Sequence, residues 1–459
     1  MTKKFKSGRR GFLKGIGVAG AAGIAFPHLW IPRPVRAETV GRGSAKHLIY
    51  LRLSGGFRFT TCFNGDVAQE FNPFGLASNI PSGTEWGPSA LLGQDEWRTE
   101  AIRALGVRSM IDVTSDMAVV PCVDHEPLSG SADGNHQTGL ERFLTGYVNG
   151  PTGLFTMINY GLRDRVEAAA AEGETILPAI IMSESGMGRG SGKYAAYRPP
   201  MIQANDLDRF GFSVDDVLPP WARKMADAYD QRHRDRQNLA HYPTVDAYLQ
   251  SRAATKAYSE IFRSDILRIQ NNSDEVVDGI SNRELATVFG DSGIGRNMRL
   301  ALRLFHFGCP AVFSNQGGYD YHSDEEMNLP GRIVELNQML AGLNYALKKM
   351  EHPDGGTYWD HTIIALGSEF SRTTRGGRFN SARGSDHGGD YATRWMAMPF
   401  MGGPITVPGW MIGRTRSSDL EPQGKVYSYR STFKTLMDAL DCDHEEFFPA
   451  DDPYDELYE

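Results

Sequence analysis

Asp320 and His322 place a carboxylate and an imidazole two residues apart, directly after an apolar run of the chain. In extended backbone, residues separated by one position point to the same side. Carboxylate and neutral imidazole are ligands that suit Zn²⁺, Mn²⁺ and Fe ions. The pair could therefore grip one metal ion, although an isolated Asp-x-His is more often a plain surface loop.

Further acidic and histidine side chains lie next to other apolar runs. They are Asp124, His125, Asp133 and His136 after residues 117–123, Glu369 after residues 361–367, and Asp386 and His387 before residues 396–400. Ligands of open α/β sheets bind beyond the carboxyl ends of the strands. If each run is a strand, four loops deliver these side chains to one edge, which predicts a shared metal or catalytic site.

The elements that must position these residues are short apolar runs rich in β-branched side chains. They occupy residues 47–53, 117–123, 176–182, 309–315 and 361–367. Runs of this kind, without strict alternation, are typical of strands buried on both faces of a parallel sheet. Asp324, Glu325 and Glu326, which follow His322, are expected to be the solvated start of the next helix.

Helical patterns separate the runs. Residues 331–350 carry leucine and isoleucine at three- and four-residue spacing and end with two lysines, which predicts a helix and makes residues 309–367 a βαβ unit. Residues 217–308 are highly charged and mostly helical in pattern, and are expected to form a helical insertion or one helical layer. This alternation of strands and helices predicts an α/β sandwich.

Residues 1–37 are typical of a targeting segment and are set apart from the fold. Arg9 and Arg10 precede a weakly apolar run at residues 15–26, which is too short to cross a bilayer, and Ala37 suits a signal peptidase. The segment resembles a Tat signal, with a flexible basic tail as the alternative. The expected mature chain is then residues 38–459, in the periplasm or secreted.

Composition narrows the classes of partner. The net charge of −8 argues against a protein that binds nucleic acid. After residue 37, no stretch approaches the ~18 consecutive apolar residues that a membrane span needs. The four cysteines are too scattered for a zinc ribbon. They could form a disulfide in an exported protein or remain buried thiols; they are Cys62, Cys122, Cys309 and Cys442.

Three motifs resemble those of a known family. They are GGYDYH at residues 317–322, GSEFSRT at residues 367–373 and RGSDHGG at residues 383–389. They are similar, in this order, to the Gly-Gly-Trp-Asp-Thr-His, Thr-Glu-Phe-Gly-Arg-Thr and Gly-Arg-Asp-His-Trp motifs of the DUF1501 proteins. These are Tat-exported bacterial proteins related in fold to the alkaline phosphatase and sulfatase superfamily. The resemblance covers most of the mature chain and implies an alkaline-phosphatase-like three-layer sandwich with a mainly parallel central sheet.

The resemblance also implies roles for single residues. Asp320 and His322 would bind one metal ion, Glu369 would be a second acidic ligand, and His387, with Asp386, would be a late histidine ligand. Arg372 would pair with an anionic oxygen of the substrate through its planar guanidinium, or form a salt bridge that fixes the loop.

The superfamily nucleophile is a Ser or Thr at a helix N-terminus after the second strand. Thr138 fits this position, in the first turn of a helix expected to begin near Gln137, where backbone N–H groups favour an anion. An ordinary helix N-cap is the alternative role for Thr138. Ser129 and Ser131 are alternative nucleophiles.

Arg58 departs from the family pattern. The family commonly carries Gly-Gly-x-Asp-Gly after the first strand, and that Asp binds metal in the superfamily, whereas this chain reads SGGFRFT at residues 54–60. A guanidinium cannot ligate a cation and repels one nearby. The site would then hold a single ion, with Arg58 replacing the other positive charge, or none.

Two functions are compatible with these features. The first is an exported protein that binds one or two divalent metal ions (Zn, Mn or Ca) and hydrolyses a small phosphate or sulfate ester. The second is a non-catalytic secreted scaffold or binding protein that reuses the fold and captures an envelope protein partner.

Overall fold

A six-stranded sheet forms the centre of the computed structural model, which describes residues 43–126, 135–171, 176–205, 207, 219–236, 258, 261–322, 325–372 and 394–458. The strand order is β2-β8-β7-β1-β6-β3. The strands are β1 His47–Leu53, β2 Met117–Asp124, β3 Ile180–Ile181, β6 Ala311–Gln316, β7 Thr362–Gly367 and β8 Trp395–Met401. The predicted signal segment, residues 1–37, lies outside the described residues.

The sheet is mainly parallel, as predicted. β1 pairs in parallel with β6 and β7, and β3 pairs in parallel with β6. The exception is β8, which pairs antiparallel with both of its neighbours, β2 and β7. Since β8 reverses the direction twice, β2 runs the same way as β7. The carboxyl ends of β1, β2, β6 and β7 therefore share one edge.

The strands are buried as their sequences predict. Every residue of β1, β2, β7 and β8 is buried. The ladder between β2 and β8 shifts register between Val120 and Val123, around Pro121. Proline lacks a backbone N–H, so it interrupts a ladder at this point.

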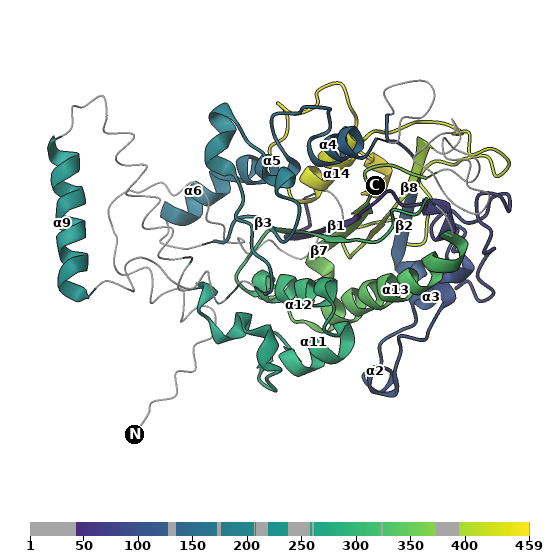
Figure 1. Ribbon diagram of the computed structural model, residues 1–459, viewed down its shortest axis with the longest axis horizontal. Coiled ribbons are helices and arrows are strands. Elements are labelled where there is room, and N and C mark those ends of the chain that lie inside the picture. Colours follow the sequence, from purple (N-terminus) through teal and green to yellow (C-terminus); the bar gives the residue numbers. More distant parts are fainter. Residues whose placement is uncertain are drawn as a thin grey trace.

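Helices lie on both faces of the sheet, which gives three layers (Figure 1). One face carries α4, α5 and α14, and the other carries α11, α12 and α13. The helices are α2 Glu100–Ala104, α3 Met110–Val113, α4 His136–Thr145, α5 Leu154–Gly161, α6 Arg163–Ala171, α9 Pro220–Arg236, α11 Asn282–Phe289, α12 Gly293–His306, α13 Glu325–Lys349 and α14 Tyr429–Ala439. A small separate hairpin joins β4 Val276–Val277 to β5 Ile280–Ser281.

The predicted βαβ unit is β6, α13 and β7, with β1 between the two strands. The helix begins at Glu325, earlier than the expected residue 331. Pro330 lies within α13, although proline disfavours a helix interior.

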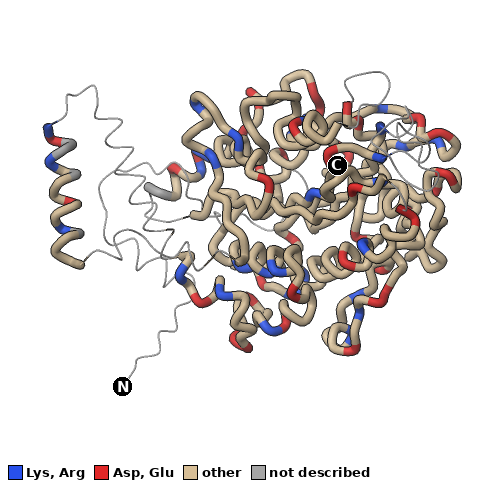
Figure 2. The backbone as a smooth tube through the Cα atoms, viewed as in Figure 1, with Lys and Arg blue, Asp and Glu red and all other residues tan. Residues whose placement is uncertain are grey.

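The charged segment 217–308 has two parts. α11 and α12 belong to the layer beside α13, whereas α9 stands away from the body (Figure 1). Figure 2 shows basic and acidic positions interspersed along α9, as expected for a helix with a solvated charged face.

All four cysteines are buried and free, so the thiol alternative holds and the structure contains no disulfide among them. Burial raises the pKa of each thiol. Within the described residues, no helix is both long enough and apolar enough to span a bilayer.

Candidate metal centre

The centre lies at the shared edge, where the loops after β1, β6 and β7 meet. Gly55, just after β1, has a positive φ of 119°. A Cβ atom built on Gly55 would lie 2.4 Å from the backbone nitrogen of Asp320. Only glycine allows this close approach, so the glycine pair after the first strand positions the loop that carries Asp320.

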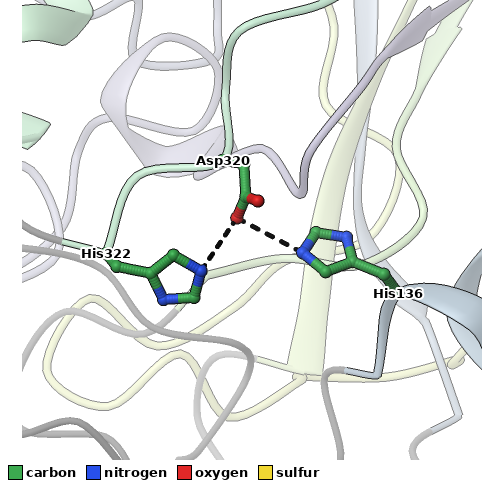
Figure 3. A group of neighbouring side chains, drawn as sticks. All are labelled: His136, Asp320 and His322. Atoms are coloured by element: carbon green, nitrogen blue, oxygen red, sulfur yellow. Dashed lines mark hydrogen bonds and ion pairs between the residues drawn. The ribbon is translucent and has the colours of Figure 1, made fainter.

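His136, Asp320 and His322 come together at this edge. One oxygen of Asp320, Oδ1, lies 3.2 Å from Nε2 of His136 and 3.1 Å from Nε2 of His322. Figure 3 shows this oxygen between the two imidazole rings. The three candidate ligand atoms all lie within 4.8 Å of one another. The structure thus brings Asp320 and His322 together, and His136 joins them from the start of α4.

Two of the three separations between these atoms fit a single metal ion. Ligands that bind one tetrahedral Zn²⁺ ion at about 2.0–2.1 Å lie about 3.3 Å apart. The two distances to Asp320 Oδ1, 3.2 and 3.1 Å, are close to that separation. Two imidazoles and one carboxylate are also a donor set that Zn²⁺ and Mn²⁺ accept.

The start of α4 sets the position of His136. Asn135 is the N-cap, and its Oδ1 accepts hydrogen bonds from the backbone N–H groups of Gln137 and Thr138. Gly139 packs directly against the loop after β7, since a Cβ atom there would lie 2.7 Å from the carbonyl oxygen of Glu369. The first turn of α4 therefore places His136 beside the carboxylate of Glu369.

Glu369 is fully buried and orients His136. Its Oε1 lies 3.3 Å from Nδ1 of His136 and accepts a hydrogen bond from the backbone N–H of Gly55 at 2.8 Å. Arg52 donates to both carboxylate oxygens, at 3.1 and 2.9 Å. Such a bidentate pair is among the stronger charge-assisted contacts. With these partners Glu369 lies behind His136 and outside the group of three candidate ligands.

These contacts control the protonation of the site. The hydrogen bond to Glu369 raises the pKa of His136, against the lowering effect of burial. Burial alone would raise the pKa of Glu369, but His136 and Arg52 lower it far below its usual value. Asp320 is held ionised in the same way, because Arg372 and His136 outweigh burial and lower its pKa.

Arg372 is buried and joins the loops together. Its Nε donates to the carbonyl oxygens of Gly55 and Gly56, at 3.0 and 2.9 Å, and its Nη2 forms an ion pair with Oδ1 of Asp320. Of the two roles expected for Arg372, the salt bridge that fixes the loop is the one seen in the structure.

Arg58 is engaged by a different carboxylate. Its Nη1 forms a salt bridge with Oε2 of Glu325 at 3.1 Å, and both side chains are buried. The prediction that Glu325 is solvated was wrong, because Glu325 starts α13 but neutralises the buried guanidinium. Glu326 is exposed, as predicted.

Thr138 lies in the first turn of α4, beside His136, and its hydroxyl donates to the carbonyl oxygen of Asn135 at 3.4 Å. Asn135, and not Thr138, is the N-cap, so the alternative role for Thr138 was wrong. Several further candidates lie outside the described residues. They are Ser129, Ser131, Asp133, Asp324, Asp386 and His387.

Two other polar residues of this edge have structural partners. Asp124 forms a salt bridge with Arg394, whose Nε lies 2.9 Å from Asp124 Oδ1. His125 is buried, and its Nδ1 accepts a hydrogen bond from the backbone N–H of Ser371 at 3.4 Å. Both support the loops around the site.

Arg52 is the functional residue that the sequence analysis missed. It lies within the apolar run of β1, where every neighbour is buried. A charged side chain in such a run is rarely buried without a partner, so its presence was a usable signal for a buried carboxylate nearby.

A protein-family model described as "Protein of unknown function (DUF1501)" matches residues 45–454, which is nearly the whole chain. This match agrees with the three motifs, two of which contain Asp320, His322, Glu369 and Arg372. No curated protein matches the chain.

Proposed function

Because this chain belongs to the DUF1501 family, whose description assigns no activity, we propose a function from the geometry of the site. The protein binds a divalent metal ion through His136, Asp320 and His322 and hydrolyses a small phosphate or sulfate ester. The observation that carries the proposal is the convergence of three ligand atoms within 4.8 Å from loops far apart in the sequence.

The cluster is accessible to a substrate. The side chains of His136, Asp320 and His322 are 38, 51 and 41% exposed. Catalytic zinc sites commonly have three protein ligands and leave one position for water or substrate, whereas structural sites are closed by four. Three ligands facing solvent therefore favour a catalytic role.

Buried residues around the cluster fix the orientation of the candidate ligand side chains. Ligating histidines usually donate their second ring N–H to a carboxylate, which fixes the tautomer and the ring orientation. Glu369 takes this role for Nδ1 of His136, and Arg52 keeps Glu369 ionised. Arg372 is buried and pairs with the same oxygen of Asp320, Oδ1, that contacts the two histidines, so it acts as a positioning residue.

A bound divalent ion would supply electrostatic stabilisation of the ester oxygens and activation of a water molecule. Asp320, His136 and His322 would hold the ion. The hydroxyl of Thr138, in the same turn as His136, is the alternative nucleophile to water.

The proposal also includes an alkaline-phosphatase-like fold and export by the Tat pathway. An alkaline-phosphatase-like arrangement is supported by the mainly parallel sheet with the site at its carboxyl edge. Export by the Tat pathway to the periplasm or beyond is supported by Arg9, Arg10 and the weakly apolar run that follows.

A second candidate function is a non-catalytic binding protein. It is favoured by the contacts of Asp320 Oδ1, which already include Arg372, His136 and His322. This network neutralises the carboxylate without a metal ion. Arg58, in place of the family's acid, also leaves the site with fewer acidic ligands.

Metal loading followed by an activity screen tests the choice. Protein stripped with a chelator is reloaded with Zn²⁺ or Mn²⁺ and assayed with p-nitrophenyl phosphate and p-nitrophenyl sulfate. The hydrolase predicts turnover that depends on the metal and is lost in Asp320→Asn. Metal binding without turnover of either ester would favour the binding protein, and a lack of metal binding would overturn both parts of the proposal.

A further inference from the structure

A cavity of about 480 Å³ lies at the same edge of the sheet, beyond the carboxyl ends of β3 and β6. This volume falls within the usual range of small-molecule sites. The start of α12 closes one side of the cavity, and Gly317, which follows β6, lines another. None of the three candidate metal ligands lines this cavity, so it is a separate feature.

Uncharged polar side chains dominate its lining. Five of them are amides, namely Gln203, Asn205, Asn297, Asn315 and Gln316. Ser183 also lines the cavity, and its hydroxyl is buried with no hydrogen-bond partner in the described part of the chain. Buried polar groups normally have partners, so an unmatched hydroxyl in a cavity wall points to a ligand or water that would supply one.

The charged residues of the lining are partly engaged already. Arg332 is paired with the carboxylate of Glu335 at 3.0 Å, and Nη1 of Arg296 donates to the carbonyl oxygen of Asp291 at 2.7 Å. The pair of Arg332 and Glu335 carries no net charge, and the amides outnumber the one remaining charge of Arg296. Amides offer both a donor and an acceptor, and hydroxyl groups of a ligand need both.

Short stretches of chain and shared side-chain contacts link the wall of the cavity to the candidate metal centre. Gly317 lines the cavity and Asp320 follows three residues later, a stretch of chain that spans at most about 11 Å. Gly318 packs against Arg332, since a Cβ atom there would lie 2.7 Å from its guanidinium. On the other side, Arg52 binds both Glu369 and Glu184, the neighbour of Ser183.

We propose that this cavity binds the uncharged, hydroxyl-rich part of the substrate, a sugar or a sugar-like polyol whose ester group reaches the metal centre. The assignment of the bound sugar as a substrate rests on the proposed function. Sugar binding itself depends only on the cavity, so the two claims can fail separately.

Saturation-transfer NMR with a panel of neutral hexoses (glucose, galactose and mannose) tests the cavity in chelator-treated protein. We expect at least one hexose to bind the wild type, and expect Asn315→Leu and Gln203→Leu to weaken it about tenfold or more, the effect of losing about 1.4 kcal/mol. Gln203 lies in a loop outside the sheet, so its variant remains informative if Asn315→Leu fails to fold. Asn271→Leu, at an exposed position outside the cavity, is the matched control and should bind as the wild type does.

Hydrolysis separates the two claims. In metal-loaded protein, Gln203→Leu should raise KM for glucose 6-phosphate and leave KM for p-nitrophenyl phosphate unchanged. Hexose binding in a protein that binds no metal would reject the proposed function and retain the cavity as a sugar site. No hexose binding, equal binding by the cavity variants, or competition by inorganic phosphate for the cavity would overturn the inference.

Discussion

His136 Nε2 lies 3.2 Å from Asp320 Oδ1, although 184 residues separate the two along the chain. His136 opens the helix that follows β2, and Asp320 follows β6. They meet because both strands end at the same edge of the sheet, and because Gly55 lets the Asp320 loop pass close to β1. The order and direction of the strands therefore bring the residues of the candidate site together, and the residues that hold them in place can each be tested by mutation.

Glu369→Gln should weaken metal binding without removing a ligand. The amide still fills the space beside His136 but no longer supplies the charge that orients and polarises Nδ1. Outer carboxylates of this kind are typically worth about 10–100-fold in metal affinity. Competition with a chromophoric chelator measures the change in Zn²⁺ affinity. Glu284→Gln, a change at a partly buried glutamate that pairs with Lys349 far from the site, should leave the affinity unchanged.

Arg58→Met should destabilise the fold and leave metal affinity unchanged. The variant leaves Glu325 as a buried charge without its arginine partner, which typically costs about 3–5 kcal/mol of stability. Urea unfolding measures the loss of free energy, and zinc titration of the folded variant measures the affinity.

The double variant Arg58→Met with Glu325→Met is the control for this pair. Removing both charges should recover most of the lost stability, because a buried ion pair can often be replaced by apolar side chains of similar volume. Loss of metal binding in the folded single variant, with stability intact, would instead support the role of Arg58 as a charge at the site.

His125 should make the protein sensitive to mild acid. Burial lowers the pKa of His125 to about 4, against about 6.5 for an unfolded histidine. At a pH between these two values, His125 binds a proton in the unfolded chain but not in the folded chain. The free energy of unfolding therefore falls as pH falls, by up to about 3 kcal/mol.

Urea unfolding of wild type and His125→Asn between pH 7 and pH 4 isolates this proton. Asparagine does not titrate, and it can still accept the hydrogen bond from the backbone N–H of Ser371. The variant should lose less stability than the wild type on acidification. Parallel pH profiles for the two proteins would show that His125 is protonated in the folded state.

Much of the sheet could be predicted from the sequence because burial on both faces leaves a plain signal. β1 has the bounds of the run at residues 47–53, and β6 and β7 differ little from theirs. The run at residues 176–182 yields only β3 Ile180–Ile181, since Pro178 has no N–H to donate to a ladder. The antiparallel direction of β8 could not be predicted, because the direction of this strand is decided by its pairing with β2 and β7.

The site was harder to predict than the fold for a related reason. Asp320 and His322 are close in sequence and could be found by their spacing, but the role of Glu369 depends on Arg52 in β1 and His136 in α4. Glu325 looked solvated because its partner, Arg58, is 267 residues away. Partners that are distant in sequence decide whether a carboxylate binds a metal, orients a histidine or neutralises an arginine.

Zinc titration of chelator-treated protein tests the central claim most directly, with wild type, Asp320→Asn and His306→Gln compared. His306 pairs with Asp278 away from the site and serves as the control histidine. The account predicts one ion per wild-type chain, unchanged affinity in His306→Gln, and a loss in Asp320→Asn larger than the ~10–100-fold expected for an outer carboxylate. A wild type that binds no ion, or an Asp320→Asn variant that binds as tightly as the wild type, would contradict it.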